Sequence, residues 1–506
     1  MDAVPVSMLM GLALAMAMAS LLIIQVSGQN SPVDHFSGGH YSQQMRKMQA
    51  LKTSLLRRDS VSLPPSSAAA PSPSISPSQV GSAPRLYLVT SYGADPTGVA
   101  DSTEAILGAL SDAFKGPSDG VLMEGIANLG GARIDLEGGS YLISRPLRFP
   151  ATGAGNLMVH GGTLKASDTF PADGYLIDLS SSSSNQKKEN NQTTVDEQLI
   201  SSSTYNYEFI TLRDLMLDSN YRGGGIAVIN SLRTTIDNCY IAHFNTTGIL
   251  IQGGHETLVH SSFLGQHITA GGDPGERSFS GTAINIVSND NAITDVVIFS
   301  AAVGVMVSGQ ANTLSGVHCY NKATGFGGTG IYLKLPSLTQ TRIVNCYLDY
   351  TGIVAEDPVQ LHISSSFFLG DAYIVFKSIN GVARGVSVVG NMFSGSGKGV
   401  EIVQLDQGNG PFKEIDQVVV DGNNVNGMKV RATVGRDSTQ GNGTSWSVDF
   451  NPILLFPNLI RHVQYSLLTT GGASFPLHAL RNVSGNRVVI ESNVAVPASV
   501  FVTVDQ

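Results

Sequence analysis

The chain has 506 residues, of which 14% are charged, 7% are aromatic and 56 are glycine, and its formal net charge is −9. This charge argues against nucleic acid as a partner, while a local basic patch would still suffice to bind an anionic polysaccharide. Three cysteines exclude a full disulfide framework, and the absence of CxxC and HExxH patterns argues against a zinc site.

The first 28 residues resemble a secretory signal. Residues 8–26 form an uncharged apolar run, and cleavage is expected near Gly28. Asp2 stands where such signals carry positive charge, so a membrane-spanning signal anchor remains the alternative. We expect a secreted, extracellular protein with no stable membrane association after cleavage. Four N-glycosylation triplets follow, at Asn191, Asn245, Asn442 and Asn482.

Residues 29–84 are polar and rich in proline and serine, which predicts a flexible segment because so little apolar surface is available to bury. The folded body is expected to start at Arg85. It begins with a strand and a turn, followed by an amphipathic helix capped by Asp101 or Ser102. Such a helix would cover the exposed end of a stack of coils.

A short phrase, one small residue followed by alternating large apolar positions, returns along the middle of the chain. It begins at Gly225, Gly248, Ala283, Gly304, Gly330, Gly352, Ala372 and Gly399. A period of about 20 to 27 residues with one longer spacing is typical of a parallel β-solenoid. The period predicts a solenoid over residues 85–430, and strands over 431–506 that close it. Equivalent side chains of neighbouring coils should lie about 4.8 Å apart.

The three cysteines fall in the same arm of the coil. Cys319 and Cys346 lie in successive coils, so a disulfide between them is sterically possible. The alternative is that Cys239, Cys319 and Cys346 are all buried small hydrophobic residues.

The segment YGADPTGVADSTEAI, residues 92–106, resembles the start of pectate-lyase-like right-handed β-helix proteins. Together with the strings at residues 265–302 and 316–361, it makes the chain similar to the plant quartet-type polygalacturonases from Arg85 to the C-terminus. The resemblance implies an all-β, single-stranded right-handed parallel β-helix (solenoid) with an N-terminal capping helix. It also implies a secreted, cofactor-free, monomeric hydrolase of α-1,4-galacturonan, the homogalacturonan of pectin. In that family the activity dissolves the pollen mother-cell wall so that microspores separate.

The better-known polygalacturonases carry four motifs that this chain largely lacks. Their Asn-Thr-Asp aligns with residues 245–247, where threonine replaces the aspartate. Their paired aspartates fall near Ser280 and Gly281, and their Gly-His-Gly falls near residues 302–304. Of their Arg-Ile-Lys only Lys334 remains. The family's active-site assignment therefore cannot be copied onto this chain.

Glycoside hydrolysis needs one carboxylic acid and one carboxylate, about 6.5–9.5 Å apart in inverting enzymes and about 5–5.5 Å apart in retaining ones. Asp218, Asp273 and Glu276 lie on the edge that precedes the repeated strand and span two coils, which suits the inverting distance. The alternative is that Asp218 caps a turn and that Asp273 forms an Asp-Pro turn. Glu356 and Asp357, before a proline, are expected to be turn residues.

The opposite end of the strand offers a second set. His255 and Asp290 occupy equivalent corners and should be near neighbours, with Gln310 one coil beyond; the alternative is a ladder of polar corner residues, of which Asn289, Asp290 and Asn291 are strong turn formers. Lys334 is placed to bind a galacturonate carboxylate, or is a solvated strand-end lysine. We therefore expect Asp218, Asp273 and Asp290 as catalytic acids in an inverting hydrolase, His255, Glu276 and Lys334 as substrate-binding residues, and no metal or cofactor.

Two other functions stay open. A pectate lyase would cleave the same polymer with calcium and a base, but acid clusters able to hold calcium are thin in this sequence. A non-catalytic β-helix that binds wall polysaccharide fits the loss of the family motifs.

Overall fold

A computed structural model describes residues 85–149, 153–180, 205–267, 279–320, 328–471 and 475–506. The predicted signal, the proline-rich segment, the sequon at Asn191 and two site residues, Asp273 and Glu276, lie outside these ranges. Within them, no helix is long and apolar enough to cross a membrane.

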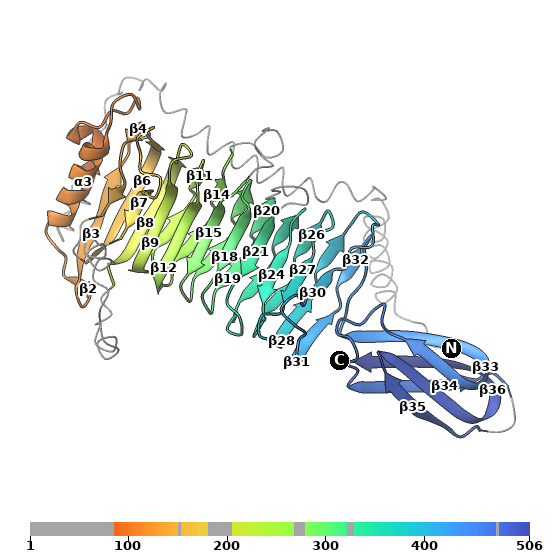
Figure 1. Ribbon diagram of the computed structural model, residues 1–506. Helices are drawn as coiled ribbons and strands as arrows, with labels where there is room; N and C mark the ends of the chain where they lie inside the picture. The colour runs from red at the N-terminus through yellow and green to blue at the C-terminus, as the bar shows by residue number, and fades with distance from the viewer. Residues whose placement is uncertain (1–84, 150–152, 181–204, 268–278, 321–327, 472–474) are drawn as a thin grey trace, which may run out of the picture. The chain divides into compact units, whose positions relative to one another are not determined.

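The folded part opens with strand β1, a short 3-10 helix η2 (Val89–Tyr92) and the helix α3 (Thr103–Lys115). The backbone N–H of Thr103 donates to Asp101 Oδ1 at 3.0 Å, whereas Ser102 holds the N-cap position without a side-chain cap bond. Ile106, Ala109 and Leu110 recur at helical spacing on the buried side of α3. This apolar side packs on β1, β3 and β5, and the helix lies at the β3 end of the stacked strands (Figure 1).

The strands from β1 to β32 form the predicted right-handed parallel β-helix, in which three parallel ladders run from coil to coil (Figure 1). We call the ladders the first, second and third face. The first face contains β5 (Leu147–Arg148), β7 (Tyr175–Leu179), β9 (Gly224–Leu232), β12 (Thr247–His255), β15 (Thr282–Val287), β18 (Val303–Val307), β21 (Thr329–Leu333), β24 (Ile353–Glu356), β27 (Ile374–Lys377) and β30 (Val403–Asp406).

The chain passes from the first face to the second and then to the third within each coil. The second face contains β1 (Leu86–Leu88), β3 (Ile126–Asp135), β6 (Ala154–Ala166), β8 (Tyr207–Asp218), β10 (Thr235–Asp237), β13 (Leu258–His260), β16 (Ala292–Thr294), β19 (Thr313–Ser315), β22 (Arg342–Val344), β25 (His362–Ser364), β28 (Val382–Val389) and β31 (Glu414–Asp421). A short antiparallel strand, β2 (Val121–Met123), pairs with β3.

The third face starts with β4 and continues through the last residues of β6 and β8, which turn from the second face into the third. It contains β4 (Ser140–Ile143), β11 (Tyr240–Ala242), β14 (Phe263–Gly265), β17 (Val297–Phe299), β20 (His318–Tyr320), β23 (Tyr347–Asp349), β26 (Phe367–Leu369), β29 (Met392–Ser394) and β32 (Asn424–Asn426).

The repeated phrase forms the strands of the first face, and its apolar positions form continuous buried rows. One row is entirely aliphatic and pairs in register through Ile226, Ile249, Ile284, Val305, Ile331, Ile353, Ile374 and Val403. The phrase begins with a small residue because the backbone of the next coil lies close to that position. A Cβ on Gly304 would lie 2.4 Å from the carbonyl oxygen of Gly330, which excludes any larger side chain there without movement.

All three cysteines are buried and free. Cys319 pairs in register with Leu348 of the next coil and not with Cys346. The interpretation as small buried side chains therefore holds, and the disulfide does not form.

Residues 434–505 form a separate four-stranded antiparallel sheet of β33 (Val434–Asp449), β34 (His462–Thr469), β35 (His478–Ser484) and β36 (Arg487–Asp505). Trp446, Phe450 and Ile490 belong to a buried cluster that is distinct from the coil interior. The strands predicted over residues 431–506 are present, but they form an antiparallel sheet with its own buried cluster, which the sequence did not predict. Alternating burial along β36 gives the sheet one apolar face, which this second cluster occupies.

Candidate active site

The strands of the first face have polar turns at both ends. We call the turns that lead into this face, residues 219–223, 243–246 and 300–302, the leading corner. We call the turns that leave it, residues 256–257, 288–291 and 308–312, the trailing corner.

The predicted site residues divide between these corners. Asp218 ends β8 at the leading corner, whereas His255 and Asp290 lie at the trailing corner. The strand β15 that separates the corners has six residues, which spans about 20 Å. Asp218 and Asp290 therefore cannot act on the same glycosidic bond, since a hydrolytic pair lies within about 9.5 Å.

At the leading corner, Asp218 is bound to a histidine that sequence reasoning missed. Ala242 pairs in register with Asp218, so His243, the next residue, lies beside that carboxylate in the following coil. His243 Nδ1 lies 2.7 Å from Asp218 Oδ1, and the two side chains are only 19% and 18% exposed. The backbone N–H of Asn220 donates to the same oxygen at 2.9 Å. A histidine one repeat after an acid was the signal that could have found this pair.

This environment keeps Asp218 ionised. Burial acts to raise the pKa of its carboxyl, but the hydrogen bond and charge of His243, the N–H of Asn220 and the charge of Lys165 outweigh burial and lower the pKa. A carboxyl of this kind suits a base that activates water and not an acid that protonates a leaving group.

An exposed aromatic ring covers the pair. Tyr221 has a positive φ of 56°, the residue is 49% exposed, and its ring lies 4.8 Å from the His243 ring. The Tyr221 hydroxyl lies 3.2 Å from Nδ1 of His267. Ligand pockets commonly combine such an aromatic surface with a few placed polar groups, and a sugar ring has apolar faces that can lie against it.

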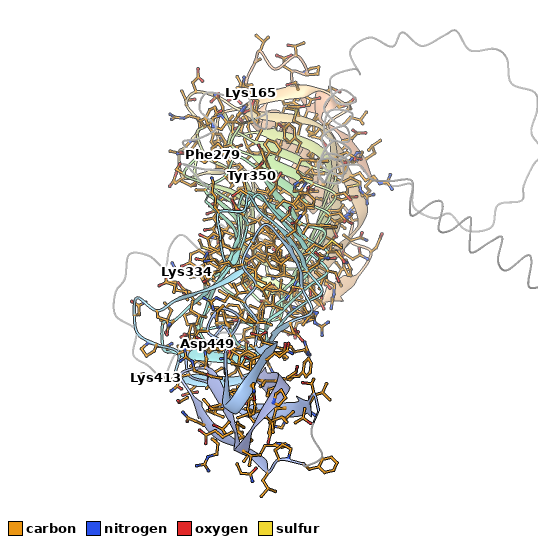
Figure 2. The ribbon with its side chains drawn as sticks, turned by 90° about the vertical axis from the view of Figure 1, so that its right-hand side faces the viewer. Lys165, Phe279, Lys334, Tyr350, Lys413 and Asp449 are labelled. Carbon is orange, nitrogen blue, oxygen red and sulfur yellow. The ribbon has the colours of Figure 1, made fainter. Side chains whose placement is uncertain are left out.

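A second carboxylate belongs to the same corner. The side-chain amide of Asn220 donates to Asp168 Oδ1 at 3.0 Å, so one asparagine joins Asp168 to Asp218. Lys165 of β6 pairs in register with Asp218 and is exposed. Figure 2 shows Lys165 and Phe279 on the same side of the molecule, and the Phe279 ring lies 5.7 Å from that of His267.

The motif positions of the better-known polygalacturonases come together as the alignment requires, but without their charges. Thr247, Thr282 (the residue after Gly281) and Val303 lie in one register row at the start of three successive strands of the first face. None carries a carboxyl group. Catalytic acids are therefore to be sought outside this row.

Further along the first face lies a cluster that the sequence analysis did not identify. Glu356, expected to be a turn residue, is buried and accepts a hydrogen bond from the Tyr332 hydroxyl at 2.6 Å. Lys377 Nζ lies 3.3 Å from both the Tyr332 hydroxyl and Glu356 Oε1. Lys334 follows β21 in the same region and is exposed. Asp357, by contrast, accepts backbone N–H bonds from residues 379–382, as a turn residue should.

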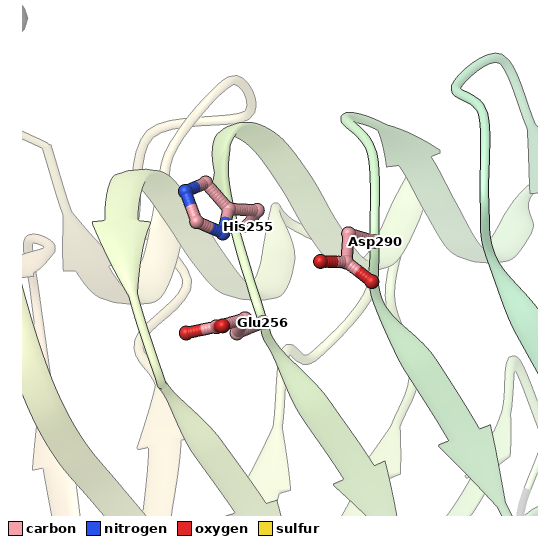
Figure 3. Close-up of side chains that lie close together, drawn as sticks. All are labelled: His255, Glu256 and Asp290. Atoms are coloured by element: carbon pink, nitrogen blue, oxygen red, sulfur yellow. The ribbon is translucent and has the colours of Figure 1, made fainter.

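At the trailing corner His255 and Asp290 are neighbours as predicted, and Glu256, not predicted, joins them (Figure 3). One ligand atom from each lies within 4.8 Å of the others, the only such group of three among the described residues. Glu256 Oε2 also lies 2.8 Å from Arg233 Nε, and Tyr205 lies 3.2 Å from His255 Nε2. The trailing corner thus contains two carboxylates, and the guanidinium of Arg233 already neutralises that of Glu256.

The family described as "Rhamnogalacturonase A/epimerase, pectate lyase-like" matches residues 88–327. The protein named Polygalacturonase QRT3, from Arabidopsis thaliana, is 63% identical over 498 residues, which cover 97% of this chain and 97% of that protein. The chain belongs to this polygalacturonase family.

Solved structures of other proteins resemble this polygalacturonase at low sequence identity. Endo-xylogalacturonan hydrolase from Aspergillus tubingensis is 13% identical with a TM-score of 0.44, and the match covers 68% of this chain and 92% of that one. The A-module of mannuronan C-5 epimerase AlgE4 from Azotobacter vinelandii is 12% identical with a TM-score of 0.42, covering 68% and 96%. These scores lie below 0.5 and bear on neither chemistry nor substrate.

Proposed function

We propose that this protein is an extracellular polygalacturonase that hydrolyses the α-1,4-galacturonan of pectin at the leading corner. The identity of 63% over nearly the whole chain with a polygalacturonase carries the assignment of activity. The half-buried Asp218–His243 pair supports the location, because it supplies an ionised carboxylate beside an exposed aromatic ring.

In this proposal Asp218 removes a proton from the attacking water, and His243 orients the carboxylate. A second carboxyl group protonates the leaving oxygen. Asp168 is one candidate, because it shares Asn220 with Asp218. Asp273 and Glu276, which precede β15 in the sequence and lie outside the described residues, are the other candidates from the sequence. Two carboxyls that are bridged through a third residue leave room for a water, which favours the inverting mechanism.

Galacturonan carries one carboxylate on each sugar, so its binding requires cations near the proposed site. Lys165 at the leading corner and Lys334 on the first face supply exposed point charges. Tyr221 offers the surface for a sugar ring. The same proposal places the protein in the plant cell wall as a monomer, acting on the pectin that holds microspores together.

The test is incubation of the purified protein with polygalacturonate, with and without a chelator, while reducing ends and unsaturated products are followed. We expect reducing ends without unsaturation and no effect of the chelator. Unsaturated products that disappear with the chelator would establish the calcium-dependent lyase instead, and retained binding without any product would establish a non-catalytic binding protein. For the lyase, the group of His255, Glu256 and Asp290 is the place among the described residues where an ion would be sought.

A further inference from the structure

A groove runs along the second face beside the trailing corner, away from the proposed catalytic residues. Its volume is about 660 Å³, within the range of pockets that hold small ligands. The groove is lined by Asp290, Ala311, Asn312, Thr313, Gln340, Arg342, Gln360, Leu361, His362, Gly385 and Ser387.

The lining consists of two rows that repeat from coil to coil. Thr313, Arg342, His362 and Ser387 pair in register on four successive strands of the second face. Beside them Gln340 and Gln360 stand at consecutive trailing corners, and Gln340 Nε2 donates to Gln360 Oε1 at 2.7 Å. Polar groups spaced at about 4.8 Å along one direction suit a linear polymer of hydroxylated units.

The charged side chains that line the groove indicate which class of polymer it can bind. Arg342 is exposed, and its guanidinium has no hydrogen-bond or ion-pair partner among the described residues. It is the one arginine or lysine in the lining. A free guanidinium among hydroxyl and amide groups matches a carboxylate carried on a sugar, since arginine binds carboxylates through two parallel hydrogen bonds.

The groove is built for binding and not for cleavage. Asp290 at one end is the only carboxyl group among the lining residues, whereas glycoside hydrolysis needs two. Asp290 also repels an anionic chain and so limits how far the chain extends in that direction.

We propose that this groove is a second, non-catalytic binding site for a uronic-acid polysaccharide, in which Arg342 pairs with a sugar carboxylate. The inference rests on the proposed function only for the identity of the polymer, galacturonan. A second site would hold the enzyme on its insoluble substrate while the leading corner cleaves another segment. The binding energy of the two sites would then combine through the local concentration of polymer.

The test is electrophoresis of the full-length native protein through gels that contain polygalacturonate, methyl-esterified pectin or a neutral xyloglucan. We expect retardation by polygalacturonate alone. The Arg342→Gln variant should bind polygalacturonate with an apparent affinity about tenfold weaker than that of the wild type. Arg342→Lys, which keeps the charge but not the paired hydrogen bonds, should fall between the two. Lys413→Gln removes one exposed charge elsewhere and is the matched control.

Hydrolysis is measured separately, as reducing ends released from short oligogalacturonides. Arg342→Gln should leave that rate and the thermal transition unchanged. The proposal would be overturned if Arg342→Gln is retarded as strongly as the wild type, or if methyl-esterified pectin retards the protein as strongly as polygalacturonate does. It would also be overturned if Arg342→Gln loses hydrolysis together with retardation. If the wild-type protein releases no reducing ends, the proposed function fails, while the gel experiment still reports whether the groove binds.

Discussion

His243 Nδ1 and Asp218 Oδ1 lie 2.7 Å apart and come from consecutive coils. The contact exists because the third face holds Ala242 directly beside Asp218, so that the next residue turns its ring onto the carboxylate. An acid and an imidazole 25 residues apart in sequence thus act as one unit. The contact with His243 keeps the Asp218 carboxylate charged and holds it in one orientation.

Replacing Asp218 by asparagine should reduce hydrolysis of polygalacturonate by about 100-fold to 10,000-fold, because the amide cannot accept the proton of the attacking water. The release of reducing ends measures this. Asp237→Asn is the matched control, since Asp237 Oδ1 also lies 3.1 Å from a histidine nitrogen, that of His260, but on the second face. Equal losses in the two variants would mean that Asp218 serves only the fold.

The pH dependence of hydrolysis should report the Asp218–His243 pair. The lowered pKa of Asp218 keeps its carboxylate charged below the usual value of 3.8, so activity should persist into that acidic range. In His243→Gln burial remains while the charge of the imidazole is lost, so the pKa should rise and the acid limb of kcat/KM should move to higher pH. An unmoved limb would assign the base to another residue.

The lowered pKa of Asp218 also predicts how the stability of the fold depends on pH. Because the folded pKa of Asp218 lies below the unfolded one, the pair stabilises the fold at pH values above the unfolded pKa. This contribution is lost as the pH falls through the lowered folded pKa. His243→Gln should therefore lower the melting temperature near neutral pH and change it less at strongly acidic pH.

Tyr221 should contribute to substrate binding through its ring. Tyr221→Ala removes the exposed surface beside His243 and should raise the KM for polygalacturonate about tenfold, a cost of about 1.4 kcal/mol. Tyr221→Phe keeps the ring and loses the hydroxyl, including its contact with His267, so its KM should stay close to that of the wild type. Similar KM values for alanine and phenylalanine would contradict a role for the ring.

The cluster on the first face should matter for stability. Lys377→Met leaves the buried Glu356 without its cation and should destabilise the fold by about 2 kcal/mol, or a melting temperature lower by a few degrees. The double variant Lys377→Met with Glu356→Gln should recover part of that loss, because no uncompensated charge remains. Thermal unfolding followed by circular dichroism measures both. Additive losses would show that the two residues do not interact.

The sequence predicted the coils well because each one repeats the same local rule. A small residue and alternating aliphatic positions specify a strand of the first face, and Gly304 shows why no larger residue fits. The proximity of His255 and Asp290 followed from the same spacing.

The sequence predicted the site less well because partners depend on register across coils. His243 stands beside Asp218 only through the pairing of β11 with β8. Glu356 ends the strand β24 two residues before a proline, where a turn residue is expected, and its buried carboxylate is bound by Tyr332 and Lys377 of two other coils. The antiparallel sheet of residues 434–505 was missed because it has no coil period to detect.

The aliphatic rows of the first face have an evolutionary consequence. They run unbroken past the starts of β12 and β15, next to Thr247 and Gly281, where the better-known polygalacturonases carry aspartates. The residues that build the coils are therefore not the residues expected to do the chemistry. A lineage can lose its ancestral acids from one row and recruit replacements from an adjacent turn while every interior contact stays the same.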